Sequence, residues 1–156
     1  DFATFKAVDK AVIVYESVWK HTQMMAEALA EGMGRNGICV KIFKCSMTSP
    51  AIIQKELMDA KAVLVGSGNY NNAMAGSIAA FLEKLIICKV KNKKGLGFGS
   101  YGWANLVTKE INARLGKAGI TLLNDEVVSQ NYTPSEADLD ALMELGKQIA
   151  EEIKAM

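Results

Sequence analysis

The chain has 156 residues, of which 50% are hydrophobic and 22% are charged, and this is the size and composition of one compact domain with a substantial core. Its formal net charge is only +1, and no apolar run approaches the ~20 residues that span a bilayer, so we expect neither nucleic acid nor a membrane as a partner. Three cysteines cannot all pair within one chain, so we expect a cytoplasmic protein. A single histidine cannot build an imidazole-rich metal site, so we expect no metal bound by this chain.

Short apolar runs alternate with helical segments along the chain. In the segment that follows the first run, Met25, Leu29 and Met33 recur at the spacing of one helix face, and a similar pattern covers the last twenty residues. The runs themselves are continuous and β-branched, as expected for parallel strands that are buried on both faces. They predict five strands, at residues 11–15, 39–43, 62–65, 95–98 and 120–128.

Several residues mark where the helices begin and end. Ser49 before Pro50 indicates a capped helix start, and Thr133-Pro134-Ser135-Glu136 is typical of a capping box. Gly37 and Gly119 suit the left-handed conformation in which helices often end.

This alternation predicts a doubly wound α/β fold. Right-handed crossovers between five parallel strands favour the strand order 2-1-3-4-5. We therefore expect one domain over residues 1–156, with residues 1–9 as an N-terminal extension or the remnant of a linker.

The segment after the first strand has the features of a phosphate-binding turn. It must turn sharply into a helix, so its backbone N–H groups point at whatever lies at the helix N-terminus. Ser17 and Thr22 can add hydroxyl donors, and Lys20 and His21 can add positive charge. The alternative is that Ser17 or Thr22 only caps the helix. The glycine-rich fingerprints of dinucleotide and nucleoside-triphosphate sites are absent from this turn.

Two further loops would lie at the same edge of the sheet. The loop at 68–72 is rich in amide side chains that can bond the edge of a heteroaromatic ring, although a simple Gly/Asn turn is the alternative. Trp103 and Trp19 both follow predicted strands, where they can form the walls of a site for a flat aromatic group. Together these loops predict an FMN site. Its candidate residues are Ser17, Val18, Trp19, Lys20, His21, Thr22, Gly68, Asn69, Tyr70, Asn71, Asn72, Ser100, Tyr101, Gly102 and Trp103.

From Lys10 to about Lys154 the chain resembles the flavodoxin-like domain of the A-type flavoproteins, also called flavodiiron proteins. The resemblance is carried by residues 12–19, 62–67, 71–72 and 91–93, and above all by Phe98-Gly99-Ser100-Tyr101-Gly102-Trp103. It implies that the first turn wraps the FMN phosphate, that the 68–72 loop lines the isoalloxazine, and that the loop from Ser100 closes the other side.

The same resemblance implies an electron-transfer domain, either an electron carrier or part of an oxygen or nitric oxide reductase, rather than a complete enzyme. Its partners would be a reductase or rubredoxin-like donor and a metal centre elsewhere that accepts the electrons, and a homodimer is possible. The resemblance implies no catalytic acid or base in this chain. Lys20, His21, Gly68, Asn69 and Ala104 depart from the family pattern, which bears on the affinity for FMN.

Proteins of three other functions have this fold or a closely similar one. An NAD(P)H-dependent quinone or flavin reductase uses a similar fold, and an interaction domain that has lost its cofactor is also compatible with the departures. A response-regulator receiver needs an aspartate at the end of the third strand, but that strand ends in Val65-Gly66-Ser67.

Overall fold

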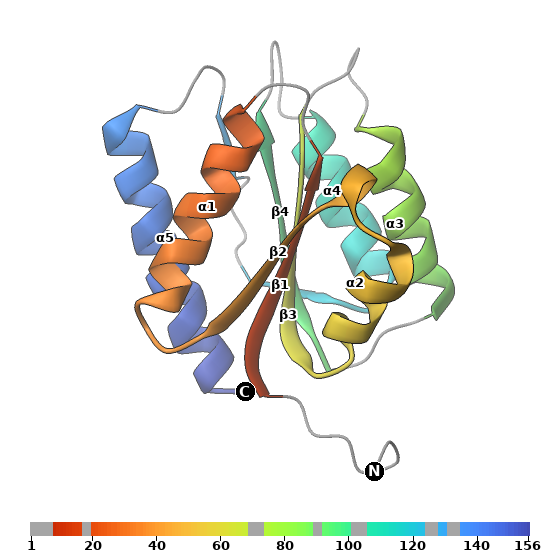
Figure 1. Ribbon diagram of the computed structural model, residues 1–156, viewed down its shortest axis with the longest axis horizontal. Helices are drawn as coiled ribbons and strands as arrows, with labels where there is room; N and C mark the ends of the chain where they lie inside the picture. Colours follow the sequence, from red (N-terminus) through yellow and green to blue (C-terminus); the bar gives the residue numbers. More distant parts are fainter. Residues whose placement is uncertain are drawn as a thin grey trace.

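The computed structural model describes residues 8–16, 20–68, 74–88, 92–100, 106–123, 128–130 and 135–156. A parallel sheet lies at the centre, with helices on both of its faces (Figure 1). The strands are β1 (Val8–Glu16), β2 (Cys39–Lys44), β3 (Ala60–Ser67), β4 (Lys94–Ser100), β5 (Thr121–Leu122) and β6 (Val128–Gln130). The helices are α1 (His21–Gly34), η2 (Cys45–Met47), α2 (Pro50–Leu57), α3 (Gly76–Cys88), α4 (Leu106–Lys117) and α5 (Glu136–Lys154).

The predicted strand order 2-1-3-4-5 is confirmed, but the fifth strand is interrupted. The sheet runs β2-β1-β3-β4-β5, and all pairings are parallel. The single strand expected at 120–128 is instead two short segments, because β5 pairs with the start of β4 and β6 with its end. Residues 124–127 between them lie outside the described part. A mixed polar run is compatible with one strand or with two, and the pairing with β4 shows two.

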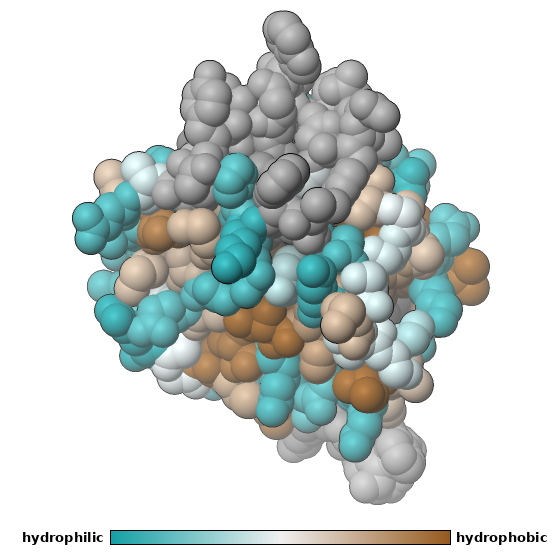
Figure 2. All heavy atoms as spheres, turned by 45° about the horizontal axis from the view of Figure 1, so that its top comes forward, coloured by the Kyte–Doolittle hydropathy of each residue, from teal (hydrophilic) through white to brown (hydrophobic). Residues whose placement is uncertain are grey.

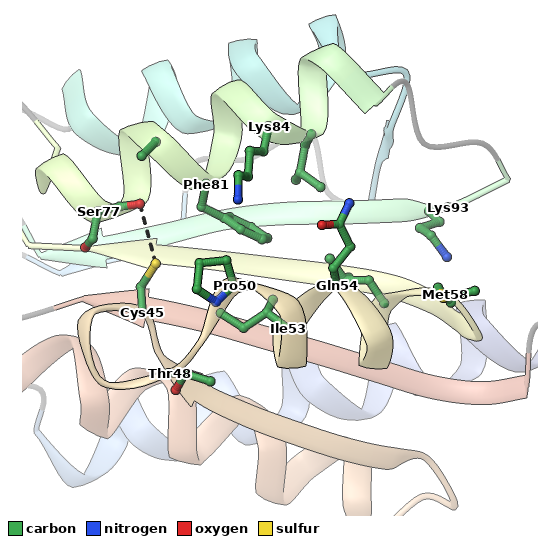
Figure 3. A pocket seen from close by; sticks show the side chains of 13 residues that line it. Cys45, Thr48, Pro50, Ile53, Gln54, Met58, Ser77, Phe81, Lys84 and Lys93 are labelled. Atoms are coloured by element: carbon green, nitrogen blue, oxygen red, sulfur yellow. Dashed lines mark hydrogen bonds between the residues drawn. The ribbon is translucent and has the colours of Figure 1, made fainter.

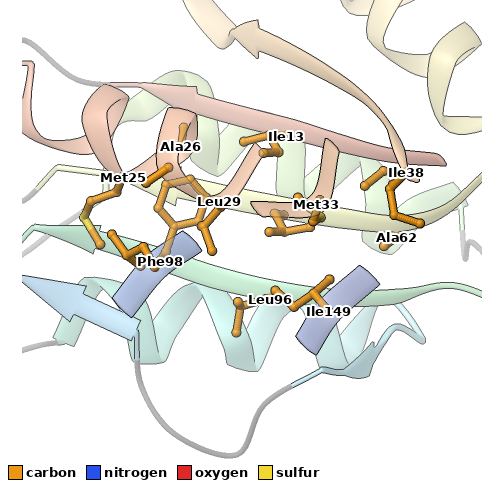
Figure 4. Close-up of a cluster of buried hydrophobic side chains, with 14 of the residues drawn as sticks. Ile13, Met25, Ala26, Leu29, Met33, Ile38, Ala62, Leu96, Phe98 and Ile149 are labelled. Atoms are coloured by element: carbon orange, nitrogen blue, oxygen red, sulfur yellow. The ribbon is translucent and has the colours of Figure 1, made fainter. Parts of the chain in front are cut away.

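The core forms on both faces of the sheet because the central strands are apolar on both sides. One cluster joins α1 and α5 to β1, β3 and β4, with Leu29, Phe98 and Ile149 among its members (Figure 4). The other cluster joins α2, α3 and α4 to the opposite face. The continuous apolar run Ala11–Tyr15 is buried throughout, as expected for a strand covered on both faces.

Helix ends agree with the sequence at most positions. Gly37 and Gly119 adopt positive φ angles of 89° and 90°, as predicted. Ser49 is the N-cap residue of α2 and Pro50 occupies its first turn, but the Ser49 side chain makes no capping hydrogen bond among the described residues. The capping box of α5 is not the predicted pair of Thr133 and Glu136. It is formed by Ser135 and Asp138, because the helix begins at Glu136.

A buried ion pair joins the start of β1 to the end of α2. The Lys10 ammonium, in a residue that is 6% exposed, lies 2.7 Å from the Asp59 carboxylate and also bonds the Glu56 carboxylate. Burial lowers the pKa of Lys10, but the hydrogen bonds to Asp59 and Glu56 outweigh it, so that pKa lies above its ordinary value. The hydrogen bond from Lys10 lowers the pKa of Glu56.

The surface is mixed in character. Figure 2 shows hydrophilic side chains over much of the visible face, with a group of hydrophobic ones near its centre. Met47 on η2, Ile52 on α2 and Ile87 on α3 are exposed by 79%, 50% and 70%. The side of the molecule formed by η2, α2 and α3 therefore leaves considerable apolar surface in water. None of the helices in the described ranges combines the length and apolar character needed to cross a membrane.

Candidate functional site

The carboxyl ends of three strands meet at one edge of the sheet, at the top of Figure 1. Glu16 at the end of β1 pairs with Ser67 of β3, and Ser67 pairs with Gly99 of β4. Helix α1 begins at the same edge, five residues after Glu16. In open parallel sheets the crevice beside these strand ends is where ligands bind, so this edge is the candidate site.

The described residues at the N-terminus of α1 leave backbone donors for an anion. Its N-cap residue, Lys20, makes no side-chain capping bond, and the N–H groups that begin a helix have no acceptor within it. The first turn contains no acidic residue. Thr22 is fully buried, and its hydroxyl has no hydrogen-bond partner among the described residues. A buried hydroxyl without a partner is unfavourable, so this atom fits a ligand oxygen that would complete it.

Ser67 fixes the two ends of the loop that follows β3. Its hydroxyl, in a fully buried residue, accepts a hydrogen bond from the Ala75 N–H at 2.9 Å and donates one to the Gly68 carbonyl at 2.8 Å. The Gly68 N–H in turn donates to the Glu16 carbonyl at 3.2 Å. The backbone on both sides of residues 69–73 is thereby held against the ends of β1 and β3.

Glu16 connects this edge by hydrogen bonds to the side of the molecule that carries α2 and α3. Its carboxylate accepts hydrogen bonds from the Ser46 N–H at 2.8 Å and from the Ser77 hydroxyl at 3.1 Å. The neighbouring Cys45 thiol donates to the Ser77 carbonyl. Burial raises the pKa of Cys45; the hydrogen bond to Ser77 lowers it, and the Glu16 charge raises it further. This thiol is therefore less acidic than an ordinary cysteine and is a poor nucleophile.

Gly99 allows β3 and β4 to approach closely at the edge. A Cβ atom at position 99 would lie 2.2 Å from the Ser67 carbonyl oxygen, so only glycine fits at this position. The glycines of this strand end thus serve packing as well as loop geometry.

The structure describes five of the predicted site residues. Lys20 is exposed, His21 is partly buried, and Thr22 and Gly68 are buried. Ser100 ends β4, which brings its backbone to the same edge as Gly68 and the start of α1. The other ten lie outside the described residues, and they are Ser17, Val18, Trp19, Asn69, Tyr70, Asn71, Asn72, Tyr101, Gly102 and Trp103.

The sequence analysis missed two residues that organise the site, Glu16 and Ser67. Both are polar residues at the ends of apolar strands, and that position is the signal that could have identified them. Their partners Ser46, Ala75 and Ser77, which lie 30, 8 and 61 positions away, carry no motif. Within the described ranges, no cluster of three or more His, Cys, Asp or Glu residues could hold a metal ion.

Comparisons with known proteins assign residues 13–146 to a family model described as flavodoxin. A nitric oxide reductase of Moorella thermoacetica is 40% identical over 144 residues, which make up 92% of this chain and 36% of that protein. A rubredoxin-oxygen oxidoreductase of Megalodesulfovibrio gigas is 34% identical over 155 residues, or 99% of this chain and 38% of that protein. The chain thus spans less than two fifths of the length of either relative.

Solved structures agree with this relationship. The rubredoxin oxygen:oxidoreductase of Desulfovibrio gigas superimposes with a TM-score of 0.91 at 33% identity, covering 99% of this chain and 38% of that chain. A flavodoxin from the domain Archaea superimposes with a TM-score of 0.84 at 30% identity, covering 93% of this chain and 99% of that chain. A flavodiiron protein from Giardia intestinalis has the same fold, with a TM-score of 0.91 at 22% identity.

Proposed function

Because this chain belongs to the flavodoxin family and matches the flavodoxin part of flavodiiron proteins, we propose that it binds one FMN at the carboxyl edge of the sheet and serves electron transfer. The observation that carries this proposal is the buried Thr22 hydroxyl, which has no partner in the described part of the chain and lies at the N-terminus of α1. A phosphate oxygen is the acceptor that both features require.

The described residues support three tasks of the protein around such a ligand. The first turn of α1 supplies backbone N–H groups and the Thr22 hydroxyl to the phosphate. Ser67 holds the ends of the loop predicted to line the ring. FMN itself supplies the capacity to accept and donate electrons, whereas the protein supplies binding, orientation and the surrounding charge.

The Glu16 carboxylate is a negative charge at this edge of the sheet. It accepts hydrogen bonds from the Ser46 N–H and the Ser77 hydroxyl, which hold it in place. A fixed negative charge opposes the addition of electrons to a nearby ligand. Glu16 therefore favours the oxidised form of the proposed flavin.

The names of two relatives support a proposal for the redox partners. One relative is named a nitric oxide reductase and another a rubredoxin-oxygen oxidoreductase, and this chain matches only a part of each. We propose that the donor is a reductase or a rubredoxin-like protein and that the acceptor is a metal centre outside this chain. This part of the proposal rests on the family.

An absorption spectrum and a titration test the proposed cofactor. The purified chain should show the visible bands of an oxidised flavin, or should bind added FMN one to one with quenching of the flavin fluorescence. FAD should bind more weakly than FMN, because a turn that encloses a terminal phosphate leaves no place for the adenylate. Equal or tighter binding of FAD, or no binding of either flavin, would overturn the proposal.

A turnover assay separates electron transfer from a reductase activity. An electron-transfer domain should show no sustained oxidation of NADH or NADPH with a quinone as acceptor. It should instead be reduced by a rubredoxin-like donor in stopped-flow mixing. Rapid steady-state turnover with a quinone would replace the proposed function with that of a quinone reductase.

A further inference from the structure

A groove of about 320 Å³ lies between α2 and α3 (Figure 3). Its inner wall is apolar, because Ile53 and Leu57 of α2 and Leu85 of α3 are buried there. Phe81 points into the space between the two helices. These helices pack on the sheet face opposite α1.

The polar groups of the groove are cationic or neutral. Lys84 reaches in from α3 and Gln54 from α2, while Lys93 lies at the far end, just before β4 (Figure 3). None of the described residues that line the groove is an aspartate or a glutamate. The charge of the lining is therefore positive on an otherwise apolar surface.

The Lys93 ammonium has no carboxylate partner among the described residues. Its Nζ donates to the Ala60 carbonyl at 2.6 Å, and no ion pair of Lys93 is found among the described residues. Burial lowers the pKa of Lys93, and the more distant Asp59 only partly offsets this. An anion in the groove would restore the interactions that this ammonium group lost on burial.

We propose that this groove binds a small carboxylate that carries an apolar chain. The carboxylate pairs with Lys93 at the far end of the groove, and the apolar chain lies on the buried side chains and Phe81 toward Lys84. At the roughly 30 Å³ that one water molecule occupies in the liquid, the volume holds about ten groups of that size. Octanoate has this size and is the probe we choose. The proposal does not depend on FMN binding.

Calorimetric titration of the purified chain with octanoate tests the site. We expect saturable binding with one site per chain, and binding about tenfold weaker for 1-octanol, which has the same apolar chain without the charge. Ala80 lines the groove and is exposed on α3, so Ala80→Leu should fold normally and abolish binding by filling the space. Unchanged binding in Ala80→Leu, or equal affinity for the alcohol, would contradict the proposal.

Charge variants test the lysines of the groove. Lys93→Met should weaken octanoate binding about tenfold, and Lys84→Met about threefold, because Lys84 lies away from the carboxylate end and water screens its more exposed ammonium. Lys55→Met is the matched control, since Lys55 is an exposed lysine of α2 that does not line the groove. It should leave the affinity unchanged. An equal loss in all three variants would show only non-specific attraction.

Sedimentation distinguishes this ligand from a second copy of the chain in the same groove. The chain should sediment as the same species with and without octanoate. If the chain instead forms a dimer that the Ala80→Leu substitution dissociates and octanoate leaves intact, the groove serves self-association and the proposal is overturned.

Discussion

The Ser67 hydroxyl accepts a hydrogen bond from the Ala75 N–H at 2.9 Å, and this contact joins the end of β3 to the residue just before α3. Ser67 is fully buried and Ala75 is 8% exposed. Because the same hydroxyl also donates to the Gly68 carbonyl, one oxygen atom closes the loop predicted to line the flavin ring.

Replacing Ser67 should weaken both the fold and the site. Ser67→Ala leaves the Ala75 N–H and the Gly68 carbonyl without their partner, so the free energy of unfolding should fall by about 2 kcal/mol. FMN affinity should fall roughly tenfold because the ring loop loses its anchor. Urea denaturation and a fluorescence titration measure the two effects. Ser46→Ala is the control, since Ser46 contacts Glu16 through its backbone N–H, and it should change neither. FMN affinity equal to wild type in Ser67→Ala would separate the loop from the flavin.

Thr22→Val should have opposite effects on the free and bound protein. Valine keeps the shape of threonine but removes a buried hydroxyl that has no partner among the described residues. The free chain should be as stable as wild type or up to about 1 kcal/mol more stable. FMN should bind at least tenfold more weakly, because a hydrogen bond to a charged phosphate is worth about 1.5–3 kcal/mol.

Riboflavin, which lacks the phosphate, is the control ligand for Thr22. Its affinity should be the same in Thr22→Val and in wild type. Thr121→Val makes the same chemical change on the exposed β5 and should alter neither ligand. An equal loss of FMN and riboflavin binding in Thr22→Val would place the hydroxyl away from the phosphate.

The crossing of α1 and α5 should tolerate no side chain at its glycines. A Cβ on Gly146 would lie 2.6 Å from the Leu29 carbonyl oxygen, and one on Gly32 would lie 2.0 Å from that of Met143. Gly146→Ala should therefore lower the free energy of unfolding by about 1–3 kcal/mol through overpacking. Gly116→Ala, in the last turn of α4 with nothing within 4 Å, should be neutral or stabilising. Equal urea midpoints for the two variants would contradict the close crossing.

Acid should lower the free energy of unfolding, partly through protonation of Glu56. The hydrogen bond from Lys10 lowers the pKa of Glu56 in the folded chain, so the unfolded chain binds more protons in acid. The stability from this pair is present above about pH 4.3, the ordinary glutamate value, and is lost as the pH falls through the folded pKa. Glu56→Gln should destabilise the chain at about pH 7 and differ less from wild type at about pH 3.

Urea midpoints measured at both pH values check the Glu56 prediction. Glu110→Gln removes a carboxylate from an exposed helical pair with Arg114 and serves as the control. Its effect should be small at either pH. A constant difference between Glu56→Gln and wild type across the acid range would show that the ion pair does not govern acid stability.

The strand order and the edge that carries the site could be predicted from sequence because burial leaves a direct pattern. A strand covered on both faces must be continuously apolar, as Ala11–Tyr15 is, and right-handed crossovers then restrict the topology. Thr22 could be predicted as a candidate phosphate donor because it lies at a helix start, in the turn that follows such a strand. The interruption of the fifth strand could not be predicted, since a mixed polar run is compatible with one strand or with two.

Contacts between distant residues were decided only by the tertiary structure. Glu16 and Ser77 are 61 positions apart, and nothing in either local sequence indicates that they bond. The lack of a protein partner for the Thr22 hydroxyl likewise depends on what packs around it. The groove with Lys84 and Lys93 arises because two separate helices leave a space above the sheet. Local patterns determine elements and their order, whereas hydrogen bonds and cavities depend on how those elements pack.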